Sequence, residues 1–294
     1  MKIDGVFSGG GIKGLAFLGA LEVLEERGLI LERVAGTSAG SLFAALVAAG
    51  FTSEEMKKEI LPMDFTLLLD KKKNPFPFKF LHWLPIYWRL GLYKGELLEE
   101  WVEQLLLKKG IRTFSDLPPG KLKMVASDLT NGRIIVLPDD LHKYDVPFES
   151  FSIAKAVRMS ASIPYFFEPV RLKNSQGKSI VVDGGVLSNF PVWLFDNGRD
   201  RVVRPFIGFS LSQKFSQKPP KRIDNSFQLF EALFTTMMDA HDARYISKKH
   251  VKNIVFIQAD MVQTTDFALD DEKKNALIER GRERTKEFLR GWSF

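Results

Sequence analysis

The chain has 294 residues, 45% of them apolar, with no cysteine and a formal net charge of +6. This composition suits a globular α/β protein with a substantial core, and it excludes disulfides, cysteine metal sites and thiolate nucleophiles. The four histidines are widely scattered, so we expect no metal centre.

The N-terminus runs from Met1 directly into a strand-like stretch, without the basic and apolar segments of a secretory signal. No apolar run approaches the ~20 residues that a membrane-spanning helix needs. We therefore expect a cytoplasmic protein whose membrane contact is peripheral, at the inner membrane face. The positive net charge suits anionic surfaces, either lipid or nucleic acid, and does not choose between them.

The first part of the chain alternates strands and helices. Residues 3–7 are β-forming and precede a glycine cluster, after which apolar residues recur at helical spacing over 15–28. A second strand over 31–35 leads almost without a loop into an alanine- and leucine-rich helix over 38–49. This βαβα order predicts a parallel sheet covered on both faces by helices.

Residues 64–93 differ in character, because aromatic residues alternate there with prolines after a cationic run. We expect an insertion that acts as a lid or lipid-docking surface, because aromatic rings and lysines suit the boundary between water and lipid. The substrate- or membrane-contacting residues would be Lys71, Lys72, Lys73, Trp83 and Trp88. The alternative is a small satellite core packed under a long loop.

The rest of the chain also mixes strands and helices. We expect strands over 122–128 and 133–137, joined by a tight turn, and further strands over 180–182, 206–211 and 254–258; helices are expected over 94–109, 152–158, 227–249 and 271–289. Since no repeat or long low-complexity linker interrupts this order, we expect a single catalytic domain over residues 1–294.

Residues 36–40, Gly-Thr-Ser-Ala-Gly, match the pattern G-x-S-x-G between a predicted strand and helix. A serine on such a turn projects its hydroxyl above the strand end. The following helix directs its N-terminal amides and positive dipole end toward Ser38, where negative charge develops during acyl transfer. Ser38 could instead simply cap the helix, but the abrupt passage from strand to helix favours a nucleophile.

Residues 9–14, Gly-Gly-Gly-Ile-Lys-Gly, follow the first strand in the same way. Consecutive glycines can expose several backbone N–H groups that would bind an oxyanion. The same residues also fit the dinucleotide pattern G-x-G-x-x-G, with Glu32 as a conceivable ribose partner. A P-loop is disfavoured, because Leu15 follows Gly14 where lysine is required.

The order of the two motifs favours the oxyanion interpretation. Neighbouring parallel strands would place both loops at the same carboxyl edge, where they can serve one substrate. An ordinary α/β-hydrolase has several strands before its nucleophile and a histidine after its acid. Here a single strand precedes that of Ser38, and the histidines after Asp183, His241 and His250, lie in or near a predicted helix, where they are more typical of surface residues.

Together these motifs resemble the patatin-like phospholipase family, in particular its bacterial acyl hydrolases, over nearly the whole chain. Its glycine-rich oxyanion block resembles residues 9–14, its nucleophile turn resembles 36–40, and its D-G-G acid motif resembles 183–185. The segment 161–169 is also similar to the family pattern. Two residues depart from it: Ser8 stands where aspartate is frequent, and Lys13 stands where arginine is frequent and offers no bidentate contact.

The resemblance implies a three-layer α/β/α sandwich around a central, mostly parallel sheet, and a serine acyl hydrolase of phospholipids or other lipids that needs no metal or other cofactor. The implied site residues are a Ser38/Asp183 catalytic dyad, an oxyanion hole of Gly9, Gly10, Gly11 and Ala39, and supporting positions Lys13, Gly14, Gly36, Gly40, Gly184 and Gly185.

Asp183 follows the apolar run 180–182, and partial burial would raise its proton affinity so that it can accept the proton of Ser38. The expected partners are a lipid substrate and a membrane surface, and no nucleic acid. Two other functions stay open: a nucleotide-binding protein that does not need Ser38, and a membrane-docking module without turnover.

Overall fold

The computed structural model describes residues 1–70, 84–175, 177–195, 204–211, 223–245 and 251–292. Its central sheet has the strand order β10-β9-β1-β2-β4-β8-β7, and β5 also pairs with β4. These strands are β1 (Lys2–Phe7), β2 (Ile30–Thr37), β4 (Leu122–Asp128), β5 (Arg133–Leu137), β7 (Val170–Asn174), β8 (Gly177–Asp183), β9 (Phe206–Ser210) and β10 (Ile254–Phe256).

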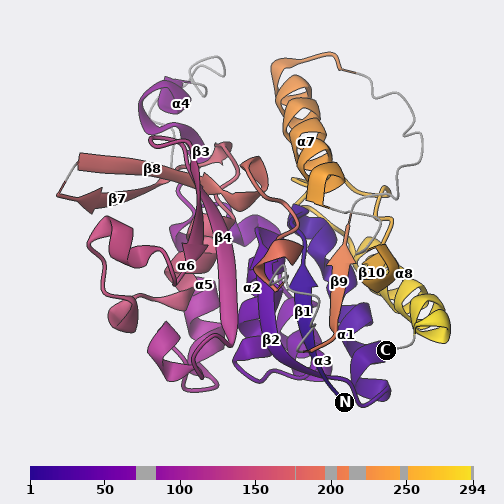
Figure 1. The fold of residues 1–294 in the computed structure, drawn as a ribbon. Coiled ribbons are helices and arrows are strands. Elements are labelled where there is room, and N and C mark those ends of the chain that lie inside the picture. Colours follow the sequence, from indigo (N-terminus) through magenta and orange to yellow (C-terminus); the bar gives the residue numbers. More distant parts are fainter. Residues whose placement is uncertain (71–83, 176, 196–203, 212–222, 246–250, 293–294) are drawn as a thin grey trace.

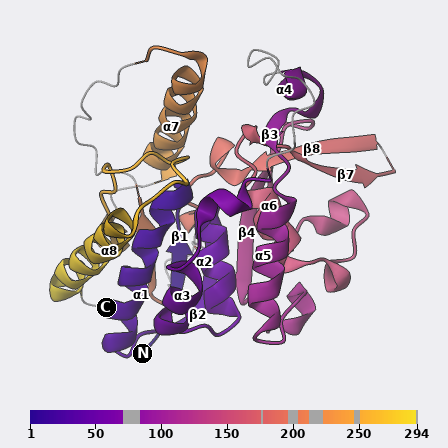
Figure 2. The ribbon, with the colours of Figure 1, turned by 180° about the vertical axis from the view of Figure 1, so that it is seen from behind.

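Helices cover one face of this sheet, as the rear view shows (Figure 2). They are α1 (Ala16–Glu26), α2 (Ala39–Ala48), α3 (Ser53–Ile60), α5 (Glu96–Leu107) and α6 (Ile153–Ser160). On the other face, Phe190 and Val192, the first residue of the short turn η8 (Val192–Leu194), pack in one cluster with Val6 of β1. Among the described helices, none is both long and apolar enough to cross a bilayer.

The C-terminal helix α8 (Asp271–Gly291) packs directly against α1 (Figure 1). A β-carbon on Gly19 would lie 1.9 Å from the carbonyl oxygen of Ile278, and one on Gly281 would lie 1.8 Å from that of Ala16. Real β-carbons do not approach backbone atoms so closely. The two glycines therefore let the first and last helices touch backbone to backbone.

Strands β1, β2, β4, β9 and β10 run parallel, whereas β8 runs antiparallel to β4. Thr37 at the end of β2 pairs with Val125, and Asp183 at the end of β8 pairs with the next residue of β4, Ala126. The last residues of β2 and β8 therefore stand at nearly the same height in the sheet, with β4 between them. This register places the end of β8 beside the turn that follows β2.

Above the carboxyl edge of the sheet, two segments project at the same end of the molecule: α4 (Leu84–Arg89) and α7 (Ser226–Tyr245) (Figure 1). Below them, the two-stranded sheet of β3 (Gly91–Tyr93) and β6 (Tyr165–Phe167) contributes to a small aromatic core. Short 3-10 turns complete the fold: η1 (Gly11–Leu15), η2 (Phe65–Leu68), η4 (Phe114–Asp116), η5 (Leu141–Tyr144), η6 (Phe148–Ser150), η7 (Gly184–Val186) and η9 (Val251–Asn253).

The expected fold class, a central and mostly parallel sheet flanked by helices, is confirmed. The sequence analysis predicted neither β7 nor the β3–β6 pair. Strands β3 and β6 have only three residues each, whereas β7 does alternate apolar and charged residues from Val170 to Lys173, and this alternation was missed. The segment 64–93 also differs from a pure insertion. Phe65 and Leu68 are buried in the main core, whereas residues 71–83 lie outside the described part of the chain.

Candidate active site

Ser38 occupies the sharp turn between β2 and α2, with backbone angles φ 53° and ψ −126°. Its positive φ is uncommon for a residue with a side chain, so neighbouring contacts must hold the turn. The backbone N–H of Ser38 donates to Ser160 Oγ at 2.9 Å, and Ser160 Oγ donates to the carbonyl oxygen of Val125 at 2.6 Å. Ser160 thus ties the turn to the neighbouring strand.

The two glycines of the G-x-S-x-G motif lie where the backbone is most crowded. A β-carbon on Gly36 would lie 2.1 Å from the carbonyl oxygen of Gly40, and one on Gly40 would lie 2.3 Å from that of Phe7. The end of β2, the start of α2 and the end of β1 therefore meet in backbone contact. This contact explains why the turn needs glycine on both sides of Ser38.

Asp183 accepts a hydrogen bond from the hydroxyl of Ser38. Ser38 Oγ donates to Asp183 Oδ2 at 2.6 Å, and the N–H of Gly185 donates to Asp183 Oδ1 at 2.7 Å. The side chain of Asp183 is fully buried. This burial raises the pKa of Asp183 to about 7, even though both hydrogen bonds favour the ionised form. Within the described residues, neither Ser38 nor Asp183 hydrogen-bonds to a histidine.

The glycine loop, residues 8–11, follows β1 and passes beside this pair. The N–H of Gly9 donates to the carbonyl oxygen of Asn189 at 3.0 Å, so that amide is already engaged. In the described parts of the chain, the N–H groups of Gly10, Gly11 and Ala39 donate to no protein acceptor. Of the four residues of the predicted oxyanion hole, these three therefore keep their amides free of protein acceptors among the residues that the structure describes.

Gly11 has a φ of 57°, and a β-carbon there would lie 2.1 Å from the carbonyl oxygen of Thr264. Both its conformation and its contact therefore require glycine. Ser8, where the family often carries aspartate, is buried, and its hydroxyl bridges the carbonyl oxygen of Gly9 and the N–H of Leu211, both at 3.0 Å. Lys13 lies in η1 and is partly buried.

A cavity of about 80 Å³ opens beside Ser38 and is lined almost entirely by apolar side chains. It is formed by residues of η1, α2, α3, η2, α5, α6 and β6, the loop between α6 and β6, and the loop before α8. Its lining includes Leu15, Leu42, Phe43, Phe65, Leu68, Leu98, Trp101, Ile163, Phe167 and Phe267. Such a surface suits a hydrocarbon chain and offers little to a polar ligand.

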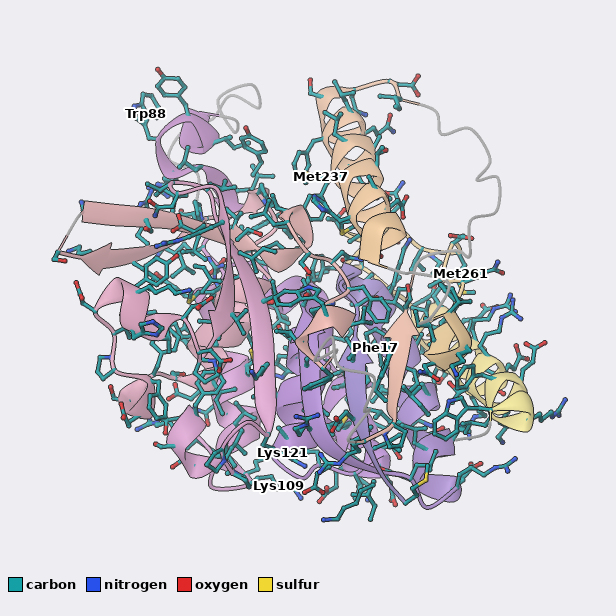
Figure 3. The ribbon with its side chains drawn as sticks, in the orientation of Figure 1. Phe17, Trp88, Lys109, Lys121, Met237 and Met261 are labelled. Atoms are coloured by element: carbon teal, nitrogen blue, oxygen red, sulfur yellow. The ribbon has the colours of Figure 1, made fainter. Side chains whose placement is uncertain are left out.

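In the part of the chain that the structure describes, the predicted lid, residues 64–93, contributes to this cavity only through its first residues, and Trp88, which was predicted to contact substrate or membrane, does not line it. Trp88 lies on α4, is 68% exposed and points away from the body of the molecule (Figure 3). Trp83 and Lys71, Lys72 and Lys73 lie outside the described residues. Phe65 and Leu68, from the start of the same segment, are among the apolar residues that line the cavity beside Ser38.

Two polar residues near the site were missed from the sequence, Ser160 and Asn189. Both are buried, and Asn189 Nδ2 donates to Asp242 Oδ2 on α7 at 2.9 Å. The available signal was weak: Ser188 and Asn189 are two polar residues between the apolar residues 186–187 and 190–193, shortly after Asp183. Its partner lies 53 residues further along the chain, which no local pattern predicts.

Known proteins resemble this chain in sequence and in fold. The family model "Patatin-like phospholipase" matches residues 5–196. The uncharacterized protein YqhO of Bacillus subtilis (strain 168) is 55% identical over the full length of both chains. The probable lipid hydrolase 463L of Invertebrate iridescent virus 6 is 28% identical over 193 residues, 64% of this chain and 61% of that protein.

Among solved structures, VipD from Legionella pneumophila superposes with a TM-score of 0.57 at 20% sequence identity. The match covers 98% of this chain and 67% of the VipD chain. At this identity the likeness establishes the fold. The shared architecture is the one described above, a central, mostly parallel sheet flanked by helices.

Proposed function

Because the chain belongs to the patatin-like phospholipase family and is a lipid acyl hydrolase, we propose that it cleaves acyl esters of phospholipids or related lipids through a Ser38/Asp183 dyad. The observation that carries the proposal is the 2.6 Å hydrogen bond from Ser38 Oγ to the fully buried Asp183. The catalytic unit would lie in one domain spanning residues 1–294.

In the first half-reaction Ser38 Oγ attacks the ester carbonyl carbon while Asp183 accepts the hydroxyl proton. The pKa of Asp183, raised by burial to about 7, suits this role, because a base works best when its pKa lies near the operating pH. Collapse of the tetrahedral intermediate breaks the ester bond. Asp183 then returns the proton to the departing alcohol, and the acyl group stays on Ser38.

In the second half-reaction water replaces the alcohol. Asp183 accepts a proton from water as the water oxygen attacks the acyl carbon, and Ser38 leaves as its hydroxyl after receiving that proton. The products are a free fatty acid and the restored enzyme. One buried carboxyl therefore serves both steps, and no histidine is needed.

The negative charge of both tetrahedral intermediates requires hydrogen-bond donors. We assign the oxyanion hole to the amides of Gly10, Gly11 and Ala39, because they are free of protein acceptors in the described structure. Ala39 is also the first residue of α2, so the positive end of the helix dipole adds to its contribution. Gly9 has a supporting role, because its amide is held by Asn189.

The competing dinucleotide interpretation of the glycine loop has less support. Thr264 occupies the space at Gly11, and a β-carbon on Gly10 would lie 2.5 Å from Leu211 Cδ1. The adjoining cavity is apolar, whereas a pyrophosphate needs polar surroundings. The same cavity suits the acyl chain of a lipid.

The decisive experiment replaces Ser38 by alanine. Hydrolysis of a panel of phospholipids and neutral esters should fall by at least about 10³-fold, because the nucleophile is lost. A fluorophosphonate probe should label the native chain at Ser38 and leave Ser38→Ala unlabelled. Ser41→Ala is unsuitable as a control, because Ser41 Oγ donates to the carbonyl oxygen of Ser38. Ser115→Ala on the distant surface is the matched control. Undiminished hydrolysis by Ser38→Ala would refute the dyad.

We further propose that the enzyme docks peripherally on membranes through the carboxyl-edge projections, α4 and α7. Exposed apolar residues gather there: Tyr87 and Trp88 on α4 are 78% and 68% exposed, and Leu229 and Leu233 on α7 are 48% and 61% exposed. Both projections stand at the carboxyl edge of the sheet (Figure 1), where Ser38 follows the end of β2. A lipid leaving a bilayer at this edge would reach Ser38 directly.

This docking is tested by changing Trp88→Ala and Leu233→Gln together. Binding to anionic phospholipid vesicles, measured by sedimentation, should weaken by about tenfold, because the variant has two fewer apolar side chains to transfer from water into the bilayer. Hydrolysis of a short soluble ester should stay within twofold. Leu107→Gln is the matched control, since Leu107 is 41% exposed at the far end of α5, near Lys109 (Figure 3). Equal vesicle binding by the double variant and the native chain would refute docking through these helices.

A further inference from the structure

Asn189 lies at the junction of three segments of the active site. It follows η7 and is only 4% exposed. Its carbonyl oxygen accepts the N–H of Gly9 at 3.0 Å, which fixes the glycine loop. Just before it, the carbonyl oxygen of Ser188 accepts the hydroxyl of Thr37 at 3.0 Å, which fixes the residue preceding Ser38. The segment 188–189 thus holds both loops that follow β1 and β2.

The carboxamide of Asn189 lies between the glycine loop and the loop that follows Asp183. A β-carbon on Gly9 would lie 2.4 Å from Asn189 Oδ1 and 3.2 Å from the β-carbon of Ser38. A β-carbon on Gly185 would lie 3.4 Å from Asn189 Oδ1 and 3.0 Å from Asp183 Oδ1. The oxygen of one side chain therefore borders both the glycine loop and the loop of the catalytic acid.

Asp242 determines which end of that carboxamide faces the loops. It lies on α7, is 3% exposed, and its Oδ2 accepts a hydrogen bond from Asn189 Nδ2 at 2.9 Å. Because Asp242 Oδ2 is the acceptor of this hydrogen bond, it selects the NH₂ end of the carboxamide and turns Oδ1 toward Gly9 and Gly185. With the opposite orientation, two oxygens would face each other at Asp242 and the NH₂ group would press against the glycine loop.

We propose that Asn189, oriented by Asp242, is a positioning residue that holds the glycine loop and the acid loop in register with Ser38. This inference rests on the proposed function, because it concerns the geometry of that same site. Asn189 acts through the loops and does not touch the reacting atoms. Through Asp242, the position of α7, a helix that carries exposed apolar residues, is linked to the oxyanion donors.

The linkage predicts a specific kinetic signature. Donors of an oxyanion hole act mainly in the transition state, so a displaced loop lowers kcat and leaves KM nearly unchanged. In Asp242→Leu we expect kcat for a short soluble ester to fall by about tenfold, with KM within twofold of the native value. Asp242→Asn retains a carbonyl oxygen that accepts from Asn189, so its kcat should stay within threefold.

A double-mutant cycle separates this role from general destabilisation. Asn189→Leu should lower kcat as Asp242→Leu does, and combining the two should cause no further loss, because both break one contact. Thr235→Val removes a hydrogen bond within α7, from Thr235 Oγ1 to the carbonyl oxygen of Glu231, and is the control with unchanged kcat. If Asp242→Leu fails to fold, Asp242→Ser is too short to reach Asn189 and replaces it.

Native kcat in a folded Asp242→Leu or Asp242→Ser chain would overturn the inference. Equal losses in Asp242→Asn and Asp242→Leu, or losses that add in the double variant, would overturn it as well. The outcome for Ser38→Ala, run in the same assay, separates the two proposals. Activity in Ser38→Ala refutes the proposed function, whereas an inactive Ser38→Ala beside a fully active Asp242→Leu refutes only the role of Asn189.

Discussion

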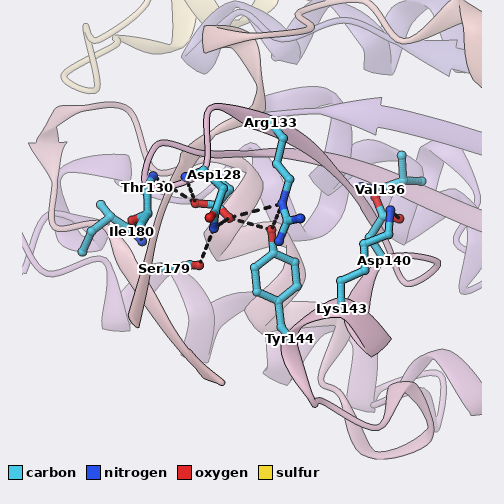
Figure 4. Close-up of polar contacts among 10 residues, drawn as sticks. Asp128, Thr130, Arg133, Val136, Asp140, Lys143, Tyr144, Ser179 and Ile180 are labelled. Carbon is cyan, nitrogen blue, oxygen red and sulfur yellow. Dashed lines mark hydrogen bonds and ion pairs between the residues drawn. The ribbon is translucent and has the colours of Figure 1, made fainter. Parts of the chain in front are cut away.

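Asp183 and Asp128 are buried carboxyl groups on adjacent, antiparallel strands, yet their surroundings differ. Asp183 accepts two hydrogen bonds, one of them from the nucleophile itself. Asp128 accepts four, from the N–H groups of Thr130 and Asn131, the side chain of Asn131 and the hydroxyl of Tyr144, and Arg133 lies 3.6 Å away (Figure 4).

Their acidities follow from this difference. Burial alone would raise the pKa of Asp128, but the hydrogen bonds from Asn131 and Tyr144 hold that pKa below its ordinary value. At Asp183 burial prevails, and the pKa rises to about 7. Burial by itself therefore does not make a base. A carboxyl becomes one where few donors compensate for its burial, and the fold supplies both situations within one pair of strands.

The comparison is tested first by exchanging each carboxyl for a carboxamide. Asp183→Asn should lower ester hydrolysis by at least about 10³-fold, because a carboxamide cannot accept the proton of Ser38. Asp128→Asn should retain activity within about threefold. Initial rates with a soluble ester, measured on both folded variants, provide the check. A comparable loss in the two variants would mean that the contrast has no catalytic meaning.

The same variants should differ in the sign of their pH dependence of stability. Because the folded-state pKa of Asp183 is raised from 3.8 to about 7, its burial favours folding most below about pH 4 and loses that benefit as the pH rises to 7. The unfolding free energy of Asp183→Asn, relative to the native chain, should therefore increase by about 4 kcal/mol across that range. Urea unfolding at several pH values measures it.

For Asp128 the sign is reversed. Its lowered pKa stabilises the fold above the unfolded-state value, and this stabilisation is lost as the pH falls through the folded-state pKa. Asp128→Asn should be less stable than the native chain near neutral pH, and the gap should close in acid. Parallel trends for the two variants would show that hydrogen bonding does not distinguish the carboxyls.

The last test is the pH profile of the native enzyme. Only ionised Asp183 can accept a proton, so kcat/KM should fall about tenfold for each pH unit below about 7 and level off above it. The profile should keep its midpoint in Asp128→Asn. A midpoint near 4 would indicate that Asp183 titrates like an exposed carboxyl.

A feature of the fold or of the site was predictable from the sequence when the residues that form it lie close together along the chain. The turn at Ser38 and the glycine loop are each encoded by five or six consecutive residues. The backbone is so crowded at both places that only the glycines of the motifs fit. The parallel pairing of β1 and β2 followed from the βαβ order. These short-range features suffice to predict the fold class and the place of the nucleophile.

Long-range features were not accessible in the same way. Nothing in the sequence of β8 indicates that this strand runs antiparallel to β4. Its direction nevertheless brings Asp183, at its end, beside Ser38. The contact between Asn189 and Asp242 joins residues 53 positions apart. In the sequence, the apolar residues Phe65 and Leu68 fit a lipid-facing surface as well as a buried position. Only the packing of η2 shows that they line the cavity.

The backbone contact between α1 and α8 has a consequence for folding kinetics. The glycine loop leads directly into α1, and α1 packs on a helix that begins far along the sequence, at Asp271. A contact between segments so distant along the chain closes a long loop, and the entropy of closing that loop must be overcome before the contact stabilises the fold. We therefore expect the scaffold of the glycine loop to form late in folding, after the local turn that carries Ser38.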